Sequence, residues 1–185
     1  MKTKTTILVI GGSLRKGSYS KVIVKEVLNL SSVSLNIITF DKLGEIPIFN
    51  QDLEVNMPDV VKELKDLIKS ADAILFVTPE YNHSIPGYLK NAIDWSTRPF
   101  SDNPYSDKAA GIISISNGML GGIRAQLALR QVGIYLNVHF LNRPEVIITN
   151  IIEKIVDGIL IDSHTKEKIN ELINALADWS IRISK

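Results

Sequence analysis

The sequence predicts an α/β domain in which a doubly wound parallel sheet of five strands is covered by helices on both faces. Runs of apolar residues without a polar interruption alternate along the chain with segments whose apolar residues recur at helical spacing. A strand that is apolar throughout is buried on both sides, as in a parallel sheet between two helical layers. The 185 residues contain no linker, repeat or low-complexity segment, so we expect one domain over residues 1–185.

The predicted elements follow one another in a regular order. Strands are expected at 7–10, 34–40, 71–78 and 109–116, with a fifth inside 135–149 whose limits are blurred by Arg143-Pro144. Helices are expected over about 22–30, from Pro58-Asp59 to 68, from Ser84 and Pro86 to 95, over 121–134 and over 169–183. Residues 150–163 contain a turn at Asp157-Gly158, and the remainder fits either a short helix or an edge strand.

The amino-acid composition argues against several classes of function. Basic and acidic residues nearly cancel, 21 against 20, which gives a formal charge of +1. Binding to nucleic acid or to anionic membranes needs a face of one sign, and an electron carrier that docks by charge needs an acidic surface, so none of these is favoured. The absence of cysteine excludes disulfides, thiolate nucleophiles and cysteine-ligated metals. No signal peptide or membrane span is apparent, and a cytoplasmic protein is expected.

Ligands of such sheets bind beyond the carboxyl ends of the strands, so three loops carry the functional argument. The first is "GGSLRKGSYSK" (11–21), where two glycines permit a sharp turn and a helix begins. Its potential donors to a terminal phosphate are the hydroxyls of Ser13, Ser18 and Ser20 and the guanidinium of Arg15. The alternative is an ordinary capped turn with a solvated arginine.

Two other nucleotide motifs fit this loop poorly. It is not a P-loop, because no G-K-[S/T] closes it, and it is not G-x-G-x-x-G, because Ser13 and Arg15 occupy positions that need glycine. Asp41 follows the second strand, where an acid that binds ribose would stand, but without the glycines that signal is weak.

The second and third loops follow the third and fourth strands. "TPEYNHSIPG" (78–87) is bracketed by prolines and offers an aromatic side chain and backbone donors to a flat polar ring; its alternative is a turn that is capped by Ser84. "SNGMLGGIR" (116–124) has three glycines that allow close backbone approach where a helix starts, and Arg124 faces either solvent or a subunit partner. Together with the first loop, they describe a site for a mononucleotide with a flat polar heterocycle.

The stretches "GSLRKGSYS", "PEYNHSIPGYLKNAIDW" and "SNGMLGGIRA" resemble the signatures of the NADPH-dependent FMN reductase family, which includes chromate and quinone reductases and some azoreductases. The resemblance runs from about residue 5 to about residue 149 and implies a flavodoxin-like fold that binds FMN. It departs from the family at Ser20, where asparagine is common, and in residues 150–163, which are longer than the usual ending. The implied FMN-binding residues are Ser13, Arg15, Ser18, Tyr19 and Ser20 around the phosphate, Pro79, Glu80, Tyr81 and Asn82 along the isoalloxazine, and Ser116, Asn117 and Gly118 at its far side.

The resemblance implies that NADPH or NADH gives a hydride to flavin N5, after which a small acceptor such as a quinone, an azo compound, chromate or free flavin is reduced. No catalytic side chain is predicted, because the flavin would carry the reaction and no protein nucleophile, acid or base is required. No metal site is predicted, because His83, His139 and His164 show no ligand spacing. The competing hypotheses are a flavodoxin-type electron carrier that docks to proteins and a non-catalytic nucleotide- or phosphate-sensing module.

A homodimer or a dimer of dimers is expected. Tyr88, Trp95 and Pro99 add apolar surface to the helix after "PEYN", beyond the stripe that one core needs, and this helix resembles the subunit contact of the family.

Overall fold

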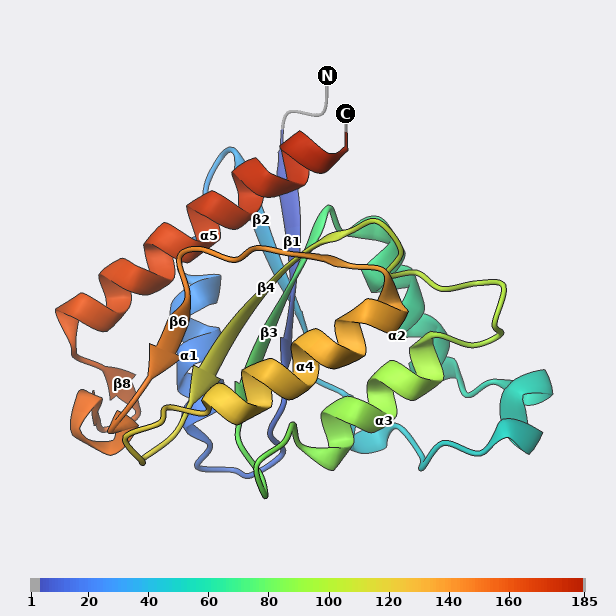
Figure 1. Ribbon diagram of the computed structural model, residues 1–185, viewed down its shortest axis with the longest axis horizontal. Coiled ribbons are helices and arrows are strands. Elements are labelled where there is room, and N and C mark those ends of the chain that lie inside the picture. The colour runs from blue at the N-terminus through green and yellow to red at the C-terminus, as the bar shows by residue number, and fades with distance from the viewer. Residues whose placement is uncertain (1–3, 185) are drawn as a thin grey trace.

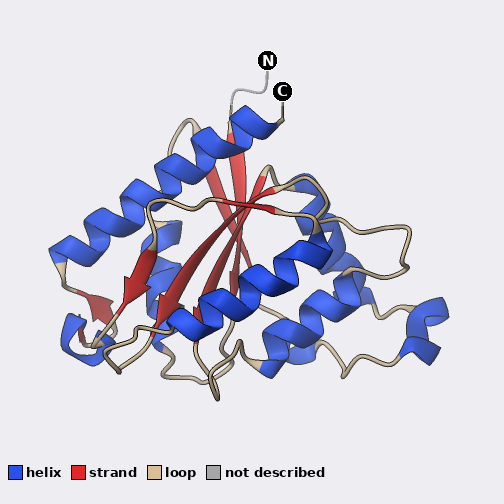
Figure 2. Cartoon of the chain, viewed as in Figure 1, coloured by secondary structure: helices blue, strands red, loops and turns tan. Residues whose placement is uncertain are grey.

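The computed structural model describes residues 4–184 and confirms the parallel sheet (Figures 1 and 2). Its strands run in the order β2-β1-β3-β4-β5, with β6 also paired to β4, and all of these pairings are parallel. The strands are β1 (Thr5–Gly11), β2 (Leu35–Phe40), β3 (Ala73–Pro79), β4 (Ala109–Ile115), β5 (His139–Phe140) and β6 (Val146–Ile148).

Helices cover both faces of the sheet, as the apolar strands predict. They are α1 (Tyr19–Leu28), α2 (Asp59–Ser70), α3 (Gly87–Ser96), α4 (Ile123–Leu136) and α5 (Ser163–Ile183). Along β1, Leu8 and Ile10 pack with α2, α3 and α4, whereas Ile7 and Val9 pack with α1 and α5. Successive strand residues point to opposite faces, so the unbroken apolar run supplies both cores at once. The chain crosses from one face to the other after α1, as in a doubly wound sheet.

The fifth strand differs from the expectation of one continuous strand. Residues 139–140 pair with Ala109 and Ala110, and residues 146–148 pair with the last three residues of β4. The segment 141–145 between them contains Pro144, which cannot donate a ladder hydrogen bond. The pairing is therefore divided into two short ladders along the same neighbour.

Residues 150–163 contain the short helix that the sequence left open, but a separate hairpin in place of an edge strand of the main sheet. A 3-10 helix, η3 (Ile151–Lys154), is followed by a two-stranded antiparallel hairpin, β7 (Ile155–Val156) and β8 (Ile159–Leu160), which turns at Asp157-Gly158. Two more 3-10 helices, η1 (Leu43–Glu45) and η2 (Gln51–Asn56), lie between β2 and α2.

One sequence expectation about the surface is wrong. Trp95 is completely buried, and its indole N–H donates to the carbonyl oxygen of Pro47 at 2.8 Å, so this side chain belongs to the core of its own chain. Tyr88 and Pro99 are exposed, as expected. His139, at the start of β5, is exposed, and its Nε2 lies 3.3 Å from a carboxylate oxygen of Asp107.

The segment after α3 is held by a buried lysine. The ammonium group of Lys65, on α2, donates to the carbonyl oxygens of Arg98 and Asp102 and lies 3.1 Å from the Asp102 carboxylate. Lys69 contacts the same carboxylate at 3.0 Å. Hydrogen bonds from Lys69 and Lys65 hold the pKa of Asp102 below its ordinary value.

Among the helices described between residues 4 and 184, none combines the length and the apolar character that crossing a bilayer requires.

Candidate functional site

Three loops meet at the carboxyl edge of the sheet and line an open cleft of about 190 Å³. They follow β1, β3 and β4, the neighbouring central strands of the sheet, so the fold itself brings them together. Ten of the twelve predicted site residues line this cleft, and Asn82 and Gly118 do not. The lining residues are Ser13, Arg15, Ser18, Tyr19, Ser20, Pro79, Glu80, Tyr81, Ile115, Ser116 and Asn117.

The β1–α1 loop presents hydroxyl groups to the cleft. Ser18 and Ser20 are 4% and 2% exposed, yet neither hydroxyl bonds to another group in the part of the chain that the structure describes. Ser18 occupies the N-cap position of α1 without capping it through its side chain. Nearly buried hydroxyls are normally hydrogen-bonded in the protein, and these two border the cleft. They are therefore available to a ligand at the start of α1.

Arg15 stands at the outer rim of the same loop. Its guanidinium lies over the ring of Tyr19, 5.3 Å from the ring centroid, and both residues line the cleft. The side chain is exposed and forms no ion pair with the rest of residues 4–184. A positive charge held beside two free hydroxyls and a helix N-terminus favours a small anion.

The β3–α3 loop is a tight hairpin. Tyr81 and Ser84 exchange two backbone hydrogen bonds of 3.0 Å, and Asn82 and His83 between them both have positive φ, 48° and 63°. Two central residues with positive φ form a type I′ turn, a conformation that asparagine tolerates. The turn places Asn82 and His83 at an exposed tip and turns the phenol of Tyr81 toward the β1–α1 loop, where its oxygen lies 3.4 Å from that of Ser13.

Glu80 lines the cleft, but its carboxylate serves a helix. Oε2 accepts hydrogen bonds from the backbone N–H groups of Arg124 and Ala125, at 3.0 and 3.3 Å, and Oε1 lies 3.8 Å from the guanidinium of Arg124. Gly122, at the N-cap position of α4, has no side chain with which to cap the helix. Glu80 supplies this cap from a different loop and so joins the second and third loops.

The β4–α4 loop is shaped by Ser116 and two glycines. The hydroxyl of Ser116 accepts the backbone N–H of Gly118 at 2.9 Å, which closes a local turn. Gly121 and Gly122 have φ values of +56° and +86°, and a Cβ on Gly121 would lie 2.3 Å from the side chain of Ile147. These positions need glycine, because the loop passes directly over β6 before α4 begins.

Sequence reasoning missed two features of this site. Ile115, the last residue of β4, adds an apolar surface to the cleft. The sequence placed it inside a buried strand. Its position at the carboxyl end of that strand, where ligands of such sheets bind, could have indicated that it lines the cleft. The capping contact of Glu80 joins residues 44 positions apart, and no local pattern indicates it.

The geometry offers one polar end and one flatter end. Hydroxyls, a guanidinium and the start of a helix gather at the β1–α1 loop, and Pro79, Ile115 and the β4–α4 loop line the cleft beyond β3 and β4, with Tyr81 reaching from the β3–α3 loop toward Ser13. This arrangement suits an elongated ligand with an anionic terminus and a planar group. It fits the phosphate and the ring of a flavin mononucleotide.

Comparison with known proteins identifies similar chains. The sequence model of a family described as NADPH-dependent FMN reductase matches residues 5–153. The chain is 40% identical over 185 residues to an NAD(P)H-dependent FMN reductase of Pseudomonas aeruginosa, covering 99% of each chain. It is 38% identical over 192 residues to an NAD(P)H:quinone oxidoreductase of Solanum tuberosum, covering 99% of this chain and 97% of the relative.

Solved structures give the same picture of the fold. The flavoenzyme NAD(P)H:(acceptor) oxidoreductase FerB of Paracoccus denitrificans superposes with a TM-score of 0.87 at 35% identity, covering 96% of this chain and 98% of the other. A WrbA-like flavodoxin of Agrobacterium tumefaciens superposes with a TM-score of 0.62 at 15% identity, covering 97% and 98%, and shows likeness of fold alone. The fold is flavodoxin-like, as the sequence motifs imply.

Proposed function

This chain belongs to the NADPH-dependent FMN reductase family, and from that membership we propose that it is an FMN-dependent oxidoreductase that takes reducing equivalents from NAD(P)H and passes them to a small acceptor. FMN, when bound, supplies the redox chemistry by accepting a hydride and giving up its electrons to the acceptor. The residues of this chain bind the cofactor, orient it and leave one side of it open to the two substrates.

The observation that carries the proposal is the pair of free hydroxyls at the start of α1. Ser18 and Ser20 are nearly buried, lack a protein partner among the described residues, and border the cleft beside Arg15. A phosphate would accept hydrogen bonds from both hydroxyls and from the guanidinium, next to the positive end of the helix. Ser20 fulfils this role although asparagine is common there in the family.

The second and third loops would hold the ring through their backbone. Glu80 and Ser116 are engaged in fixing loop geometry, so neither side chain is free to act on a substrate. Backbone N–H groups held in place in this way stabilise negative charge on a reduced ring without moving. We therefore assign no side chain of this site as an acid or a base.

A quinone is the acceptor that we propose. The support comes from relatives that are named quinone reductases, including one of Pseudomonas putida that is 34% identical over 177 residues. A cleft that is open to solvent admits a flat acceptor after the oxidised nicotinamide leaves, which gives alternating turnover.

The colour of the purified protein tests the proposed function. Yellow protein that is bleached by NADPH under argon, and that regains its colour when a benzoquinone is added, is the expected result. Yellow protein that NADPH does not bleach would instead indicate a flavodoxin-type carrier. Colourless protein that cannot be reconstituted with FMN would contradict both.

We also propose that a second copy of the chain covers an apolar patch formed by α3, the segment that follows it and α4. The patch comprises Tyr88, Phe100, Leu127, Ile134 and Tyr135, which are between 49% and 81% exposed. The rings of Phe100 and Tyr135 lie 6.4 Å apart and join the end of α3 to α4. Exposed apolar groups that cluster in this way mark an interaction surface.

Light scattering tests the oligomeric state. The native protein should be a dimer or a dimer of dimers at micromolar concentration, and Ile134→Glu, which places a charge on the patch, should shift it to a smaller species. A native monomer would contradict the proposal.

A further inference from the structure

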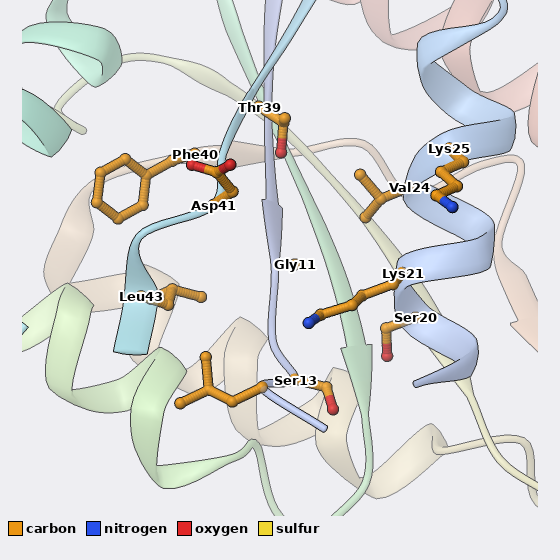
Figure 3. Close-up of a pocket in the computed structure, with 11 residues that line it drawn as sticks. Gly11, Ser13, Ser20, Lys21, Val24, Lys25, Thr39, Phe40, Asp41 and Leu43 are labelled. Carbon is orange, nitrogen blue, oxygen red and sulfur yellow. The ribbon is translucent and has the colours of Figure 1, made fainter. Parts of the chain in front are cut away.

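A second pocket lies beside the flavin cleft, between α1 and the carboxyl ends of β1 and β2 (Figure 3). We call it the α1–β2 pocket. Its volume is about 360 Å³, and it shares Ser13 and Ser20 with the flavin cleft, so the two adjoin. Its floor is the end of β1 at Gly11, where a Cβ would approach the side chain of Val24 to 3.3 Å.

The walls of this pocket carry opposite charges. Lys21 and Lys25 stand one turn apart on α1, and Asp41 follows directly after β2 on the other side. Figure 3 shows the Lys21 side chain extending from α1 toward β1, with Asp41 on the far side of β1, at the end of β2. None of the three forms an ion pair with any group in residues 4–184, whereas Lys42, Lys90 and other surface lysines do.

Two like charges one helical turn apart repel each other, and no carboxylate of residues 4–184 lies within ion-pair distance of either ammonium group; the nearest acid in the lining, Asp41, stands on the facing wall. An anion in the pocket would offset this repulsion: Lys21, which extends from α1 toward β1, would donate to it, and Lys25 would add its charge from the α1 wall. The carboxylate of Asp41 accepts only, so the opposite end of the ligand must carry hydroxyl or amine donors. Leu14, Val24, Phe40 and Leu43 form the apolar part of the lining.

The size and the position of the pocket restrict the ligand further. Pockets for small molecules run from about 300 to about 1,000 Å³, so this one is at the lower end and holds one sugar or nucleoside rather than a dinucleotide. In dinucleotide-binding doubly wound sheets, a carboxylate at the end of the second strand binds the ribose hydroxyls, and Asp41 occupies the equivalent place here, although the glycine-rich turn of those proteins is absent. We propose that the α1–β2 pocket binds a ribose phosphate unit, with the phosphate at Lys21 and Lys25 and the sugar hydroxyls at Asp41.

Two sources supply this chemistry: the adenosine half of the NAD(P)H co-substrate, and a free nucleotide or sugar phosphate. The first rests on the proposed function, because the dinucleotide would have to reach from the flavin cleft across the wall at Ser13 and Ser20. The site itself does not depend on which source fills it.

Titration of FMN-loaded protein with AMP tests the site, because the loaded cofactor blocks the flavin cleft. AMP and ribose 5-phosphate should both bind, and adenosine, which lacks the phosphate, should bind at least tenfold more weakly. Lys21→Ala/Lys25→Ala should weaken AMP binding by about 10- to 100-fold, since charge-assisted hydrogen bonds are lost. Asp41→Asn should weaken the binding of ribose 5-phosphate more than that of inorganic phosphate.

Lys62→Ala/Lys166→Ala is the matched control, because it removes two surface charges from other helices and should leave AMP binding unchanged. Failure of AMP and ribose 5-phosphate to bind at millimolar concentration, or equal binding to the Lys21/Lys25 double variant, would overturn the proposal. Competitive inhibition by AMP against NADPH identifies the co-substrate as the occupant; binding without an effect on the KM for NADPH identifies a free phosphorylated ligand. Flavin content and its bleaching by NADPH test the proposed function separately, since neither requires AMP to bind.

Discussion

Replacing Glu80 by alanine tests whether this residue holds the site together or contacts the ring. The substitution removes both acceptor contacts to the start of α4, at 3.0 and 3.3 Å, and leaves those N–H groups without a cap. Loss of a helix N-cap costs about 0.5–2 kcal/mol. The ion pair to the guanidinium of Arg124 at 3.8 Å adds little, because that side chain is 43% exposed. We expect a loss of about 1–2 kcal/mol in the free energy of unfolding.

For a chain of this length, such a loss corresponds to a decrease in Tm of about 2–8 °C. The measurement is thermal unfolding of the flavin-free protein, because bound FMN would add its own stabilisation. Glu80→Gln is the control: it keeps an acceptor oxygen and loses the charge, so its Tm should fall by less than that of the alanine variant.

The affinity for FMN separates the two interpretations of Glu80. If the carboxylate serves α4, FMN should bind to Glu80→Ala within about tenfold of the native affinity, because only loop order is changed. An unchanged Tm together with abolished FMN binding would refute the capping role and return Glu80 to direct contact with the ring.

Three further predictions concern the phosphate, a backbone turn and pH. Arg15→Ala should weaken FMN binding by about 10- to 100-fold and leave riboflavin, which lacks the phosphate, nearly unaffected in the same fluorescence titration; equal losses would contradict a phosphate contact. Gly121→Ala should destabilise the protein by more than Gly158→Ala in denaturant titrations, because both have positive φ but only the first Cβ meets another side chain. The lowered pKa of Asp102 stabilises the fold above the ordinary aspartate pKa of about 3.9, and this stability is lost as the pH falls through the folded-state value. The difference in Tm between native protein and Asp102→Asn should therefore shrink below about pH 4, and a constant difference would contradict it.

Much of this fold could be predicted because its signals are local. The three central strands, β1, β3 and β4, are dominated by apolar runs, because a strand that is buried on both faces has few positions for polar side chains. The fifth was blurred at Arg143-Pro144, where the chain leaves the sheet between two short ladders. Helix α5 begins at Ser163, before the apolar stripe that predicted it, because Asp162 caps it by accepting the N–H of Thr165. The burial of Trp95 depends on a carbonyl 48 residues earlier in the chain, which no periodicity reveals.

In the candidate site, too, the local features could be predicted from the sequence, and the contacts between distant residues could not. Loops rich in glycine, serine and proline after three strands predicted the cleft, because the carboxyl ends of parallel strands share one edge. The roles of individual side chains depend on contacts between loops, as at Glu80. The α1–β2 pocket was beyond sequence reasoning, since Lys21 and Asp41 become neighbours only when β1 and β2 pair.

The divided fifth strand also affects how this protein behaves at high concentration. A continuous outer strand offers an unbroken row of N–H and C=O groups, onto which a strand from another molecule can add. Here the outer ladder consists of a two-residue and a three-residue segment, interrupted by a turn that contains proline. A strand from another molecule could pair with only two or three consecutive residues along this edge. The edge therefore resists edge-to-edge aggregation, even though its side chains are largely apolar.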